Sequence, residues 1–187
     1  MEEEIQLILE DARDLMRKAV EHTTHELTKI RAGKAQPSML DDIRVDYYGS
    51  PTPVNQVATV NTPDARTIVV RPFEKKMLAA IERAIINSDL GLNPQNDGEI
   101  IRLNLPPLTE ERRQGLVRQA KAEIEQGKIS IRNIRKDANN MLSKLQKEGA
   151  AEDAIKRATD NVQSLTDQNV TKLDELFGRK EKDIMTV

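Results

Sequence analysis

The chain has 187 residues, enough for one or two domains with a buried core. Aromatic residues make up only 2% of it and tryptophan is absent, which predicts an aliphatic core of the kind found in helical bundles. Because cysteine is absent, disulfides, thiolate metal sites and cysteine nucleophiles are excluded. The acidic start is unlike a targeting peptide, and no apolar run approaches the roughly 18 residues that span a bilayer. We therefore expect a cytoplasmic protein without a membrane partner.

The formal net charge of −2 conceals an uneven distribution of charge along the chain. Residues 1–30 carry 4 basic and 8 acidic groups, and residues 148–187 carry 6 and 9. Residues 106–147 carry 10 basic and 5 acidic groups, so this segment alone is basic. Residues 31–105 carry 9 of each, so a basic segment in an otherwise neutral or acidic chain favours a surface that binds a polyanion.

The first segments differ in their hydrophobic period. Residues 2 to about 30 place apolar or small side chains at intervals of three and four, which predicts an amphipathic helix. In residues 31–105 the period falls to about 2, which predicts strands. We expect strands at residues 43–45, 54–60, 67–71 and 99–105, a helix at 74–87, and a turn at 49–53 that joins the first two strands as a hairpin.

Two further helices are predicted in the last part of the chain. The segment 117–145 has an unbroken three-and-four spacing, typical of a long helix with a packed seam, and residues 151–183 repeat the pattern. A short turn at 147–150, in which Gly149 can take a left-handed conformation, makes the two helices antiparallel neighbours. The seam of the first of them consists of Val117, Ala120, Ile124, Gly127, Ile131, Ile134, Ala138, Met141 and Leu145.

These elements predict an α+β protein with two domains. Residues 1–30 and 106–187 form a three-helix bundle, and residues 31–105 form a small α+β domain inserted between its first and second helices. Such an architecture leaves the helix over 117–145 with one face in the bundle and another face open to partners.

That open face carries a line of cations beside the apolar seam. Five of the seven residues at the two heptad positions that flank the seam are basic, whereas the remaining outer positions mix both charges. Solvation alone explains some such lines, but the other two bundle helices are net acidic, so binding of folded RNA through its backbone is our interpretation. Because an arginine can bind two phosphate oxygens at once, Arg132 and Arg135 are the best candidates for phosphate contacts in this line. The line consists of Arg118, Lys121, Lys128, Arg132 and Arg135.

Both connections to the inserted domain carry residues that free or restrict the backbone. Residues 31–34 contain a glycine, and residues 104–107 end in two prolines that block helix continuation. Two such links side by side can act as a hinge, although the glycine can equally serve as a helix cap and the prolines as a helix start. The candidate hinge residues are Arg31, Gly33, Lys34, Pro106 and Pro107.

The sequence offers no convincing catalytic site. His22 and His25 are too few to hold zinc without cysteine, and Asp41, Asp42 and Asp46 are typical of solvated turn carboxylates. We therefore expect a protein that is not an enzyme and needs no cofactor or metal. Two alternatives stay open: a coiled-coil scaffold or co-chaperone without RNA binding, and an enzyme in the inserted domain that uses the three aspartates.

Five strings of the chain, in order and with fitting intervals, resemble the ribosome recycling factor family. The resemblance covers essentially the whole chain. The strings are LTKIRAGK at 27–34, YYGSPTP at 47–53, SDLGLNP at 88–94, LPPLTEERR at 105–113 and RNIRKDAN at 132–139.

The resemblance implies an L-shaped monomer that enters the ribosome after termination and, with elongation factor G and GTP, splits it into subunits. It implies that the bundle lies along large-subunit ribosomal RNA and that Arg132 and Arg135 contact this RNA, with Lys136 as a weaker candidate. Arg31 and Lys34 fall at positions that are also basic in relatives, and Lys34 and Lys136 stand where many members have arginine. The inserted domain is implied to meet elongation factor G.

Overall fold

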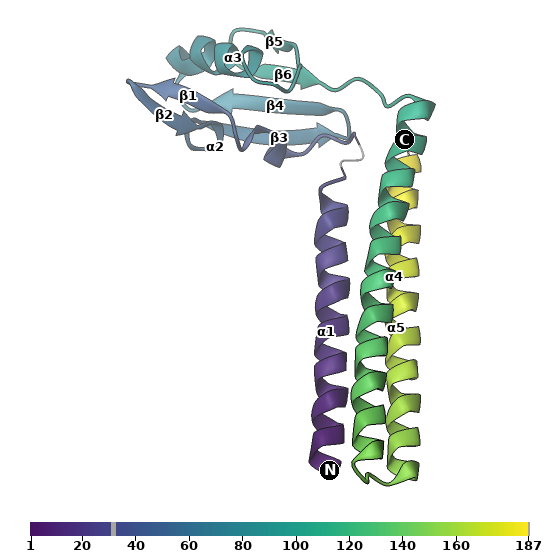
Figure 1. Cartoon of the computed structure of the whole chain (residues 1–187). Helices are drawn as coiled ribbons and strands as arrows, with labels where there is room; N and C mark the ends of the chain where they lie inside the picture. The colour runs from purple at the N-terminus through teal and green to yellow at the C-terminus, as the bar shows by residue number, and fades with distance from the viewer. Residues whose placement is uncertain (31–32, 187) are drawn as a thin grey trace. The chain divides into compact units, whose positions relative to one another are not determined.

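The computed structural model describes residues 1–30 and 33–186, and its chain divides into two compact units. One unit comprises Met1–Ala32 and Glu110–Val187, and the other comprises Gly33–Thr109. The first unit is therefore discontinuous in sequence, because the chain leaves it after its first helix and returns for the other two (Figure 1). The predicted fold class, α+β with a helical bundle and a small sheet domain, is confirmed.

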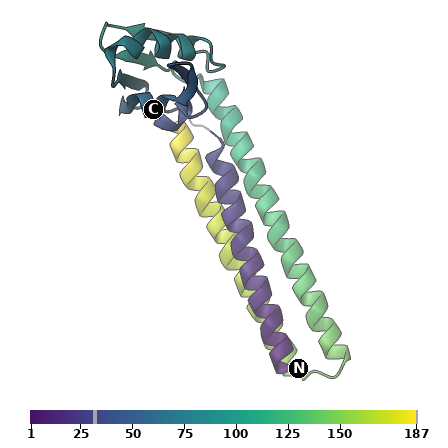
Figure 2. The same ribbon diagram turned by 90° about the vertical axis from the view of Figure 1, so that its left-hand side faces the viewer.

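Three long helices make up the bundle. They are α1 (Glu2–Thr28), α4 (Glu110–Lys147) and α5 (Glu152–Met185), and each packs against the other two (Figure 2). With 38 residues, α4 is about 57 Å long. All three are amphipathic, and their apolar stripes meet along the bundle axis; at the N-terminal end of α1 the cluster includes Ile5, Leu142 and Val162.

The buried face of α4 differs in detail from the predicted seam. Leu116 and Leu142 are buried, whereas Val117 and Ile134 are only partly buried and Met141 is 45% exposed. The reason is that α4 faces two partner helices, so its buried face is wider than a single heptad seam. A straight helix also drifts relative to a strict seven-residue repeat, which moves neighbouring positions into the core.

The middle of the bundle contains a close approach between helices at Gly127 of α4. A Cβ built at this glycine would overlap the hydroxyl of Thr23 in α1 and lie 3.2 Å from Leu173 Cδ1 in α5. The Thr23 hydroxyl donates a hydrogen bond to the carbonyl of Ala19 at 3.0 Å, so it is buried without being unpaired. The absence of a side chain at Gly127 therefore permits α1 and α4 to approach at this level.

The turn between α4 and α5 follows the prediction for Gly149, which has a φ of +106°. The N–H of Ala150 donates to the carbonyl of Leu145 at 3.0 Å, and the N–H of Gly149 donates to that of Gln146 at 3.1 Å. These two bonds form a Schellman motif, which satisfies carbonyls at the end of a helix. Ala150 and Leu145 are both buried in the same cluster, so the turn is also held by an apolar contact.

The first hairpin of the inserted domain is tighter than predicted. Strand β1 (Arg44–Tyr47) pairs antiparallel with β2 (Ser50–Pro53) through a two-residue turn. Tyr48 and Gly49 both have positive φ, +50° and +86°, as type I′ hairpin turns require. The expected pairing of the first strand with residues 54–60 is therefore wrong. The proline-containing segment is itself a strand, which its place in a two-stranded sheet with open edges allows.

A second, four-stranded sheet follows, antiparallel throughout. Its strands are β3 (Ala58–Asp64), β4 (Thr67–Pro72), β5 (Pro94–Asn96) and β6 (Ile101–Asn104), in the order β3-β4-β6-β5. The four-residue helix α2 (Val54–Val57) precedes it. Strand β5 is absent from the sequence prediction because its three polar and proline residues have no apolar alternation.

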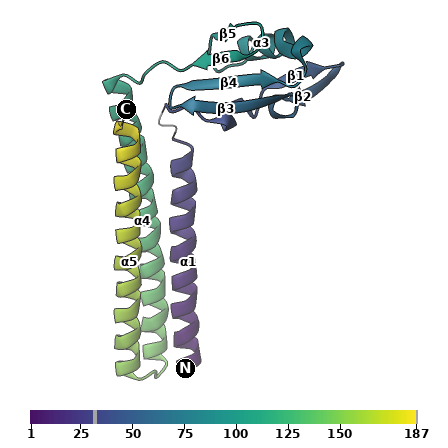
Figure 3. The ribbon, with the colours of Figure 1, turned by 180° about the vertical axis from the view of Figure 1, so that it is seen from behind.

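One helix covers this sheet. It is α3 (Leu78–Ile86), preceded by the 3-10 helix η2 (Lys75–Met77), and another 3-10 helix, η1 (Pro37–Leu40), comes before β1. The views from the front and from behind show α3 lying along the sheet (Figures 1 and 3). The predicted helix over 74–87 is thus confirmed with a shorter α-helical part.

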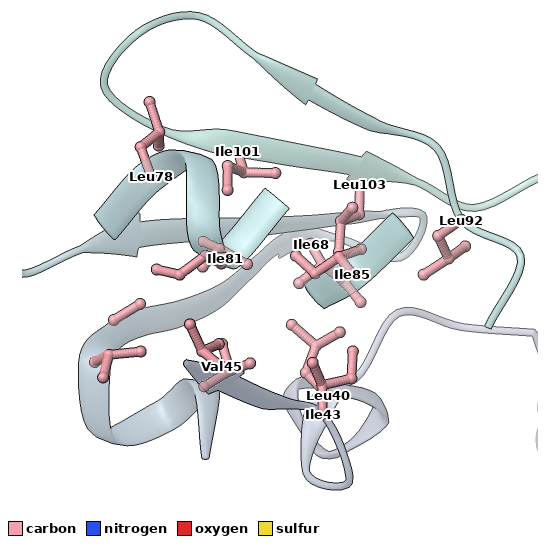
Figure 4. Packing of buried hydrophobic residues seen from close by; sticks show 14 of the residues in the cluster. Leu40, Ile43, Val45, Ile68, Leu78, Ile81, Ile85, Leu92, Ile101 and Leu103 are labelled. Atoms are coloured by element: carbon pink, nitrogen blue, oxygen red, sulfur yellow. The ribbon is translucent and has the colours of Figure 1, made fainter. Parts of the chain in front are cut away.

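The inserted domain has a hydrophobic core of its own. Ile81 and Ile85 of α3 gather with Ile68 and Leu103 of the four-stranded sheet, and all four side chains are fully buried (Figure 4). Val45 of β1 is also fully buried in this cluster. A separate core indicates that this unit is stabilised independently of the bundle.

Two tyrosines connect the first hairpin to the residues that precede α3. The Tyr47 and Tyr48 hydroxyls donate to Oε1 and Oε2 of Glu74, each at 3.0 Å. These hydrogen bonds stabilise the ionised carboxylate and hold the pKa of Glu74 below its ordinary value. The bond from Tyr48 makes the largest contribution and the bond from Tyr47 the next largest. Because the folded pKa lies below the unfolded one, this carboxylate adds stability above the unfolded pKa and loses it as the pH falls through the folded pKa.

We predict that replacing Gly127 by alanine lowers the free energy of unfolding by about 1 kcal/mol, because overpacking against Thr23 outweighs the better helix propensity of alanine. The matched control is Gly115→Ala, also in α4, where no atom lies within 4 Å of the added Cβ. This control is expected to gain about 0.5–1 kcal/mol. Urea unfolding measures both, and a gain in both would contradict the close approach.

We also predict that the double variant Tyr47→Phe, Tyr48→Phe raises the pKa of Glu74, because the carboxylate loses its two hydroxyl donors. An NMR titration of the side-chain carboxyl measures the change. Asp97 serves as the control, since backbone N–H groups of Ile100 and Glu99 lower its pKa. An unchanged midpoint for Glu74 would show that the hydroxyls do not hold it.

Candidate nucleic-acid interface on α4

The six predicted RNA-binding residues all lie on one side of α4. Since each residue turns a helix by about 100°, they fall within an arc of about 100° beside the buried face. Three of them follow one another at intervals of seven and lie next to α5; we call Lys121, Lys128 and Arg135 the inner cations. The others lie farther from the core; we call Arg118, Arg132 and Lys136 the outer cations.

Two inner cations contact α5. Lys128 Nζ lies 2.6 Å from Asp174 Oδ1 and 3.8 Å from Glu125 Oε1, and only 16% of the Lys128 side chain is exposed. Arg135 Nη1 donates to Gln163 Oε1 at 3.4 Å, and Gln163 Nε2 in turn donates to Asp167 Oδ1 at 2.9 Å. The ammonium of Lys128 is thus committed to the bundle, whereas the partly buried Arg135 keeps most of its donors available.

The outer cations are exposed. Within residues 1–30 and 33–186, Arg118, Arg132 and Lys136 form no hydrogen bond or ion pair. The same holds for the inner cation Lys121, which is also exposed. Exposed cations without protein partners can meet phosphate oxygens without first breaking an ion pair.

A line of carboxylates on α5, which the sequence prediction missed, accompanies the inner cations. Its members are exposed and recur every seven residues, so they share one side of α5. The repeat is visible in the sequence, but only the antiparallel packing of α4 and α5 shows that it lies beside the cations. We call the line the acidic row; it consists of Asp153, Asp160, Asp167, Asp174 and Glu181.

A groove of about 560 Å³ lies where the first turns of α4 meet the last turns of α5. Arg118 of the outer cations and Glu181 of the acidic row both line it, together with Val117 and Gly178. Val117 therefore lines this groove, although the sequence placed it in the packed seam. The cationic surface and the acidic row thus meet at this end of the bundle.

The two connections to the inserted domain are anchored to one turn of that domain. The N–H of Ala35 donates to the carbonyl of Ala65, and the N–H of Leu105 donates to that of Arg66, both at 2.8 Å. Residues 65 and 66 form the turn between β3 and β4. Both chain segments therefore leave the sheet from neighbouring points.

Of the predicted hinge residues, Gly33 has the most restrictive surroundings. Its φ is +72°, and a Cβ added to it would overlap the side chain of Leu108. Pro106 and Pro107 are exposed and precede the start of α4 at Glu110, while Lys34 is partly buried. Arg31 lies outside the described residues.

The three aspartates considered for catalysis lie just after a 3-10 helix or next to a hairpin turn. Asp46 Oδ1 accepts the N–H of Gly49 at 2.8 Å and so stabilises the first hairpin turn. Asp41 caps η1, and Asp41 and Asp42 are exposed. In the part of the chain that the structure describes, no three His, Cys, Asp or Glu side chains converge as a metal site. Over the same residues, no helix is both long and apolar enough to cross a membrane.

Comparison with known proteins gives a consistent result. The family model for the ribosome recycling factor matches residues 23–185. The ribosome-recycling factor of Cytophaga hutchinsonii is 57% identical over 185 residues, which cover 99% of this chain and 100% of that protein. The one from Flavobacterium johnsoniae is 52% identical over 187 residues and the full length of both chains.

Two solved structures are similar over nearly the whole chain. A solution structure of the ribosome recycling factor has a TM-score of 0.71 and 39% identity, covering 98% of each chain. The second describes models for the T. thermophilus ribosome recycling factor and the E. coli elongation factor G bound to the E. coli post-termination complex. It has a TM-score of 0.59 and 44% identity, and covers 97% of this chain and 99% of that one.

These matches extend over both units and show a family of translation factors, rather than an enzyme in the inserted domain or a coiled-coil scaffold or co-chaperone. The chain belongs to the ribosome recycling factor family, whose members are translation factors that act in ribosome recycling and are not enzymes.

Proposed function

We propose that this protein binds the post-termination ribosome in the cytoplasm and, as a monomer, splits it into subunits together with elongation factor G and GTP. Family membership over residues 23–185 carries the proposal. The related T. thermophilus factor supports it, because that protein is described together with elongation factor G on the post-termination complex. The bundle supplies the ribosome-binding surface, and the inserted domain is the partner of elongation factor G.

The surface for large-subunit ribosomal RNA is, in this proposal, the cationic side of α4. Arg132 and Arg135 are its central contacts, since a guanidinium can bind two phosphate oxygens at once and a lysine cannot. Arg118, Lys121 and Lys136 extend the surface along a helix about 57 Å long. Lys128 belongs to the predicted set, but its ion pair with Asp174 makes it the least available member.

We propose in addition that residues 31–34 and 104–107 form a hinge through which elongation factor G moves the inserted domain relative to the bundle. Support comes from the anchoring of both segments at the β3–β4 turn, which lets them bend at neighbouring points. Gly33 has a positive φ, which glycine adopts without strain, so the backbone can turn there, whereas the two prolines fix φ just before α4. The proposed hinge also includes Lys34 and Arg31, the latter outside the described residues.

We predict that Arg135→Ala weakens binding to large ribosomal subunits and reduces the slope of log affinity against log salt concentration by about 0.7–0.9, because one phosphate contact is lost. Subunit splitting, followed by light scattering with elongation factor G and GTP, should fall in parallel. The weak 3.4 Å bond to Gln163 indicates that the fold tolerates the change.

The matched control is Arg157→Ala, which removes the same charge from an exposed position on α5. Arg157 precedes Gln163 by six residues and so points about 120° away from it around the helix. Its loss should leave the salt slope unchanged. Equal effects of the two substitutions would reduce the role of Arg135 to its contribution to net charge.

For the hinge, Gly33→Ala is expected to slow splitting several-fold while leaving ribosome binding within about twofold, because a Cβ at positive φ costs about 1–2 kcal/mol and here also meets Leu108. Gly49→Ala is the control, since its φ is +86° but no atom lies within 4 Å of the added Cβ. If both variants split ribosomes at the wild-type rate, the hinge proposal fails.

A further inference from the structure

The acidic row of α5 runs in register with the inner cations of α4. The helices are antiparallel, so seven residues forward on α4 correspond to seven residues back on α5. Lys128 is opposite Asp174, to which it is bonded, and Arg135 reaches Asp167 through Gln163. The same register places Lys121 at the level of Glu181. At three successive levels a cation of α4 thus lies opposite a carboxylate of α5, and at the level of Lys128 and Asp174 the two form an ion pair.

We propose that the acidic row marks one border of the RNA-binding surface and directs phosphates toward the outer cations. This inference rests on the proposed binding of RNA to α4, and it specifies which of the cations the RNA contacts. Asp174 keeps Lys128 on the protein side of the border. The RNA backbone lies over Arg118, Arg132 and Lys136, reaches the donors that Arg135 does not use for Gln163, and stays off α5.

The exposure of the paired groups supports a border rather than a purely structural ion pair. The Lys128 side chain is 16% exposed, whereas the Asp174 side chain is 58% exposed. The cation is therefore shielded from an approaching phosphate, and the carboxylate is presented to it. RNA that crossed onto α5 would meet negative charge and would find Lys128 already neutralised.

The distances involved make this repulsion effective. Packed helices lie about 8–10 Å apart, and the Debye length is about 10 Å at 0.1 M salt. A phosphate held by the outer face of α4 therefore lies at the limit of electrostatic repulsion by the acidic row. A phosphate at the junction between α4 and α5 lies well within the range of that repulsion. The border thus discriminates between these two positions at physiological salt.

The test is Asp174→Asn, which preserves shape and removes the charge that faces Lys128. The control is Glu175→Gln on the next residue, which removes the same charge from a side chain about 100° farther around α5. Circular dichroism and thermal unfolding establish that both variants are folded. The probes are isolated large ribosomal subunits and their extracted RNA, titrated from low to high salt.

We expect Asp174→Asn to bind more tightly, by several-fold and up to about eightfold at 0.1 M salt, with a salt slope steeper by about 0.7–0.9, because Lys128 becomes available to a phosphate. Glu175→Gln should remain within about twofold of the wild type at an unchanged slope. In a Lys128→Gln background, Asp174→Asn should lose most of its gain. Glu181→Gln, which acts on a different level, should shift the affinity in the same direction as Asp174→Asn.

Equal effects of Asp174→Asn and Glu175→Gln would overturn the border, because net charge alone would then explain both. Weaker binding by Asp174→Asn would also overturn it, since Asp174 would then hold Lys128 in position for RNA. Failure of the proposed function is distinguishable from these results. In that case Arg132→Ala and Arg135→Ala would themselves leave the affinity of the large subunit unchanged.

Discussion

The structure depends on one constraint, namely that α4 must be buried on one side and remain available on another. Its periodicity places Leu116, Ile124 and Ile131 between α1 and α5 and turns the cations away from them. The glycine at position 127 lets α1 come close at mid-height, so the bundle is held by two neighbours without covering the cationic side. The binding surface is therefore a consequence of how the bundle packs.

The inserted domain meets a different requirement. It interrupts the bundle, so both of its connections must leave it close together, and the β3–β4 turn holds both through backbone hydrogen bonds. Its core around Ile81 and Ile85 is separate from that of the bundle. A unit with its own core can transmit force as a body, which is what the proposed action of elongation factor G on a hinge needs.

Much of this architecture could be predicted from the sequence, because long helices with sustained apolar periods carry a strong signal. The same holds for the turn at Gly149 and for the cationic side of α4. Strands β2 and β5 could not be predicted, since prolines and polar residues conceal them and only pairing with β1 and β6 defines them. The ends of the α4 seam were also missed, because two partner helices decide which neighbouring apolar residue is buried.

For the candidate interface, the sequence predicted which residues are basic but not which of them are already paired. The Lys128–Asp174 contact joins residues 46 positions apart in sequence, so it depends on the register of two antiparallel helices. The sequence of α5 contains acidic residues at every seventh position, but from the sequence alone this repeat cannot be distinguished from an ordinary solvated helix face. Only the packing of α5 against α4 brings these carboxylates next to the cations.

The most direct test of the central claim, that α4 presents its cationic side to ribosomal RNA, is site-directed cleavage of that RNA. Because the chain has no cysteine, Glu125→Cys among the cations and Asp11→Cys on the exposed surface of α1 each carry a single tethered iron chelate that generates hydroxyl radicals. We predict strong cleavage of large-subunit RNA from position 125 and weak cleavage from position 11. Equal cleavage, or stronger cleavage from position 11, would contradict this account.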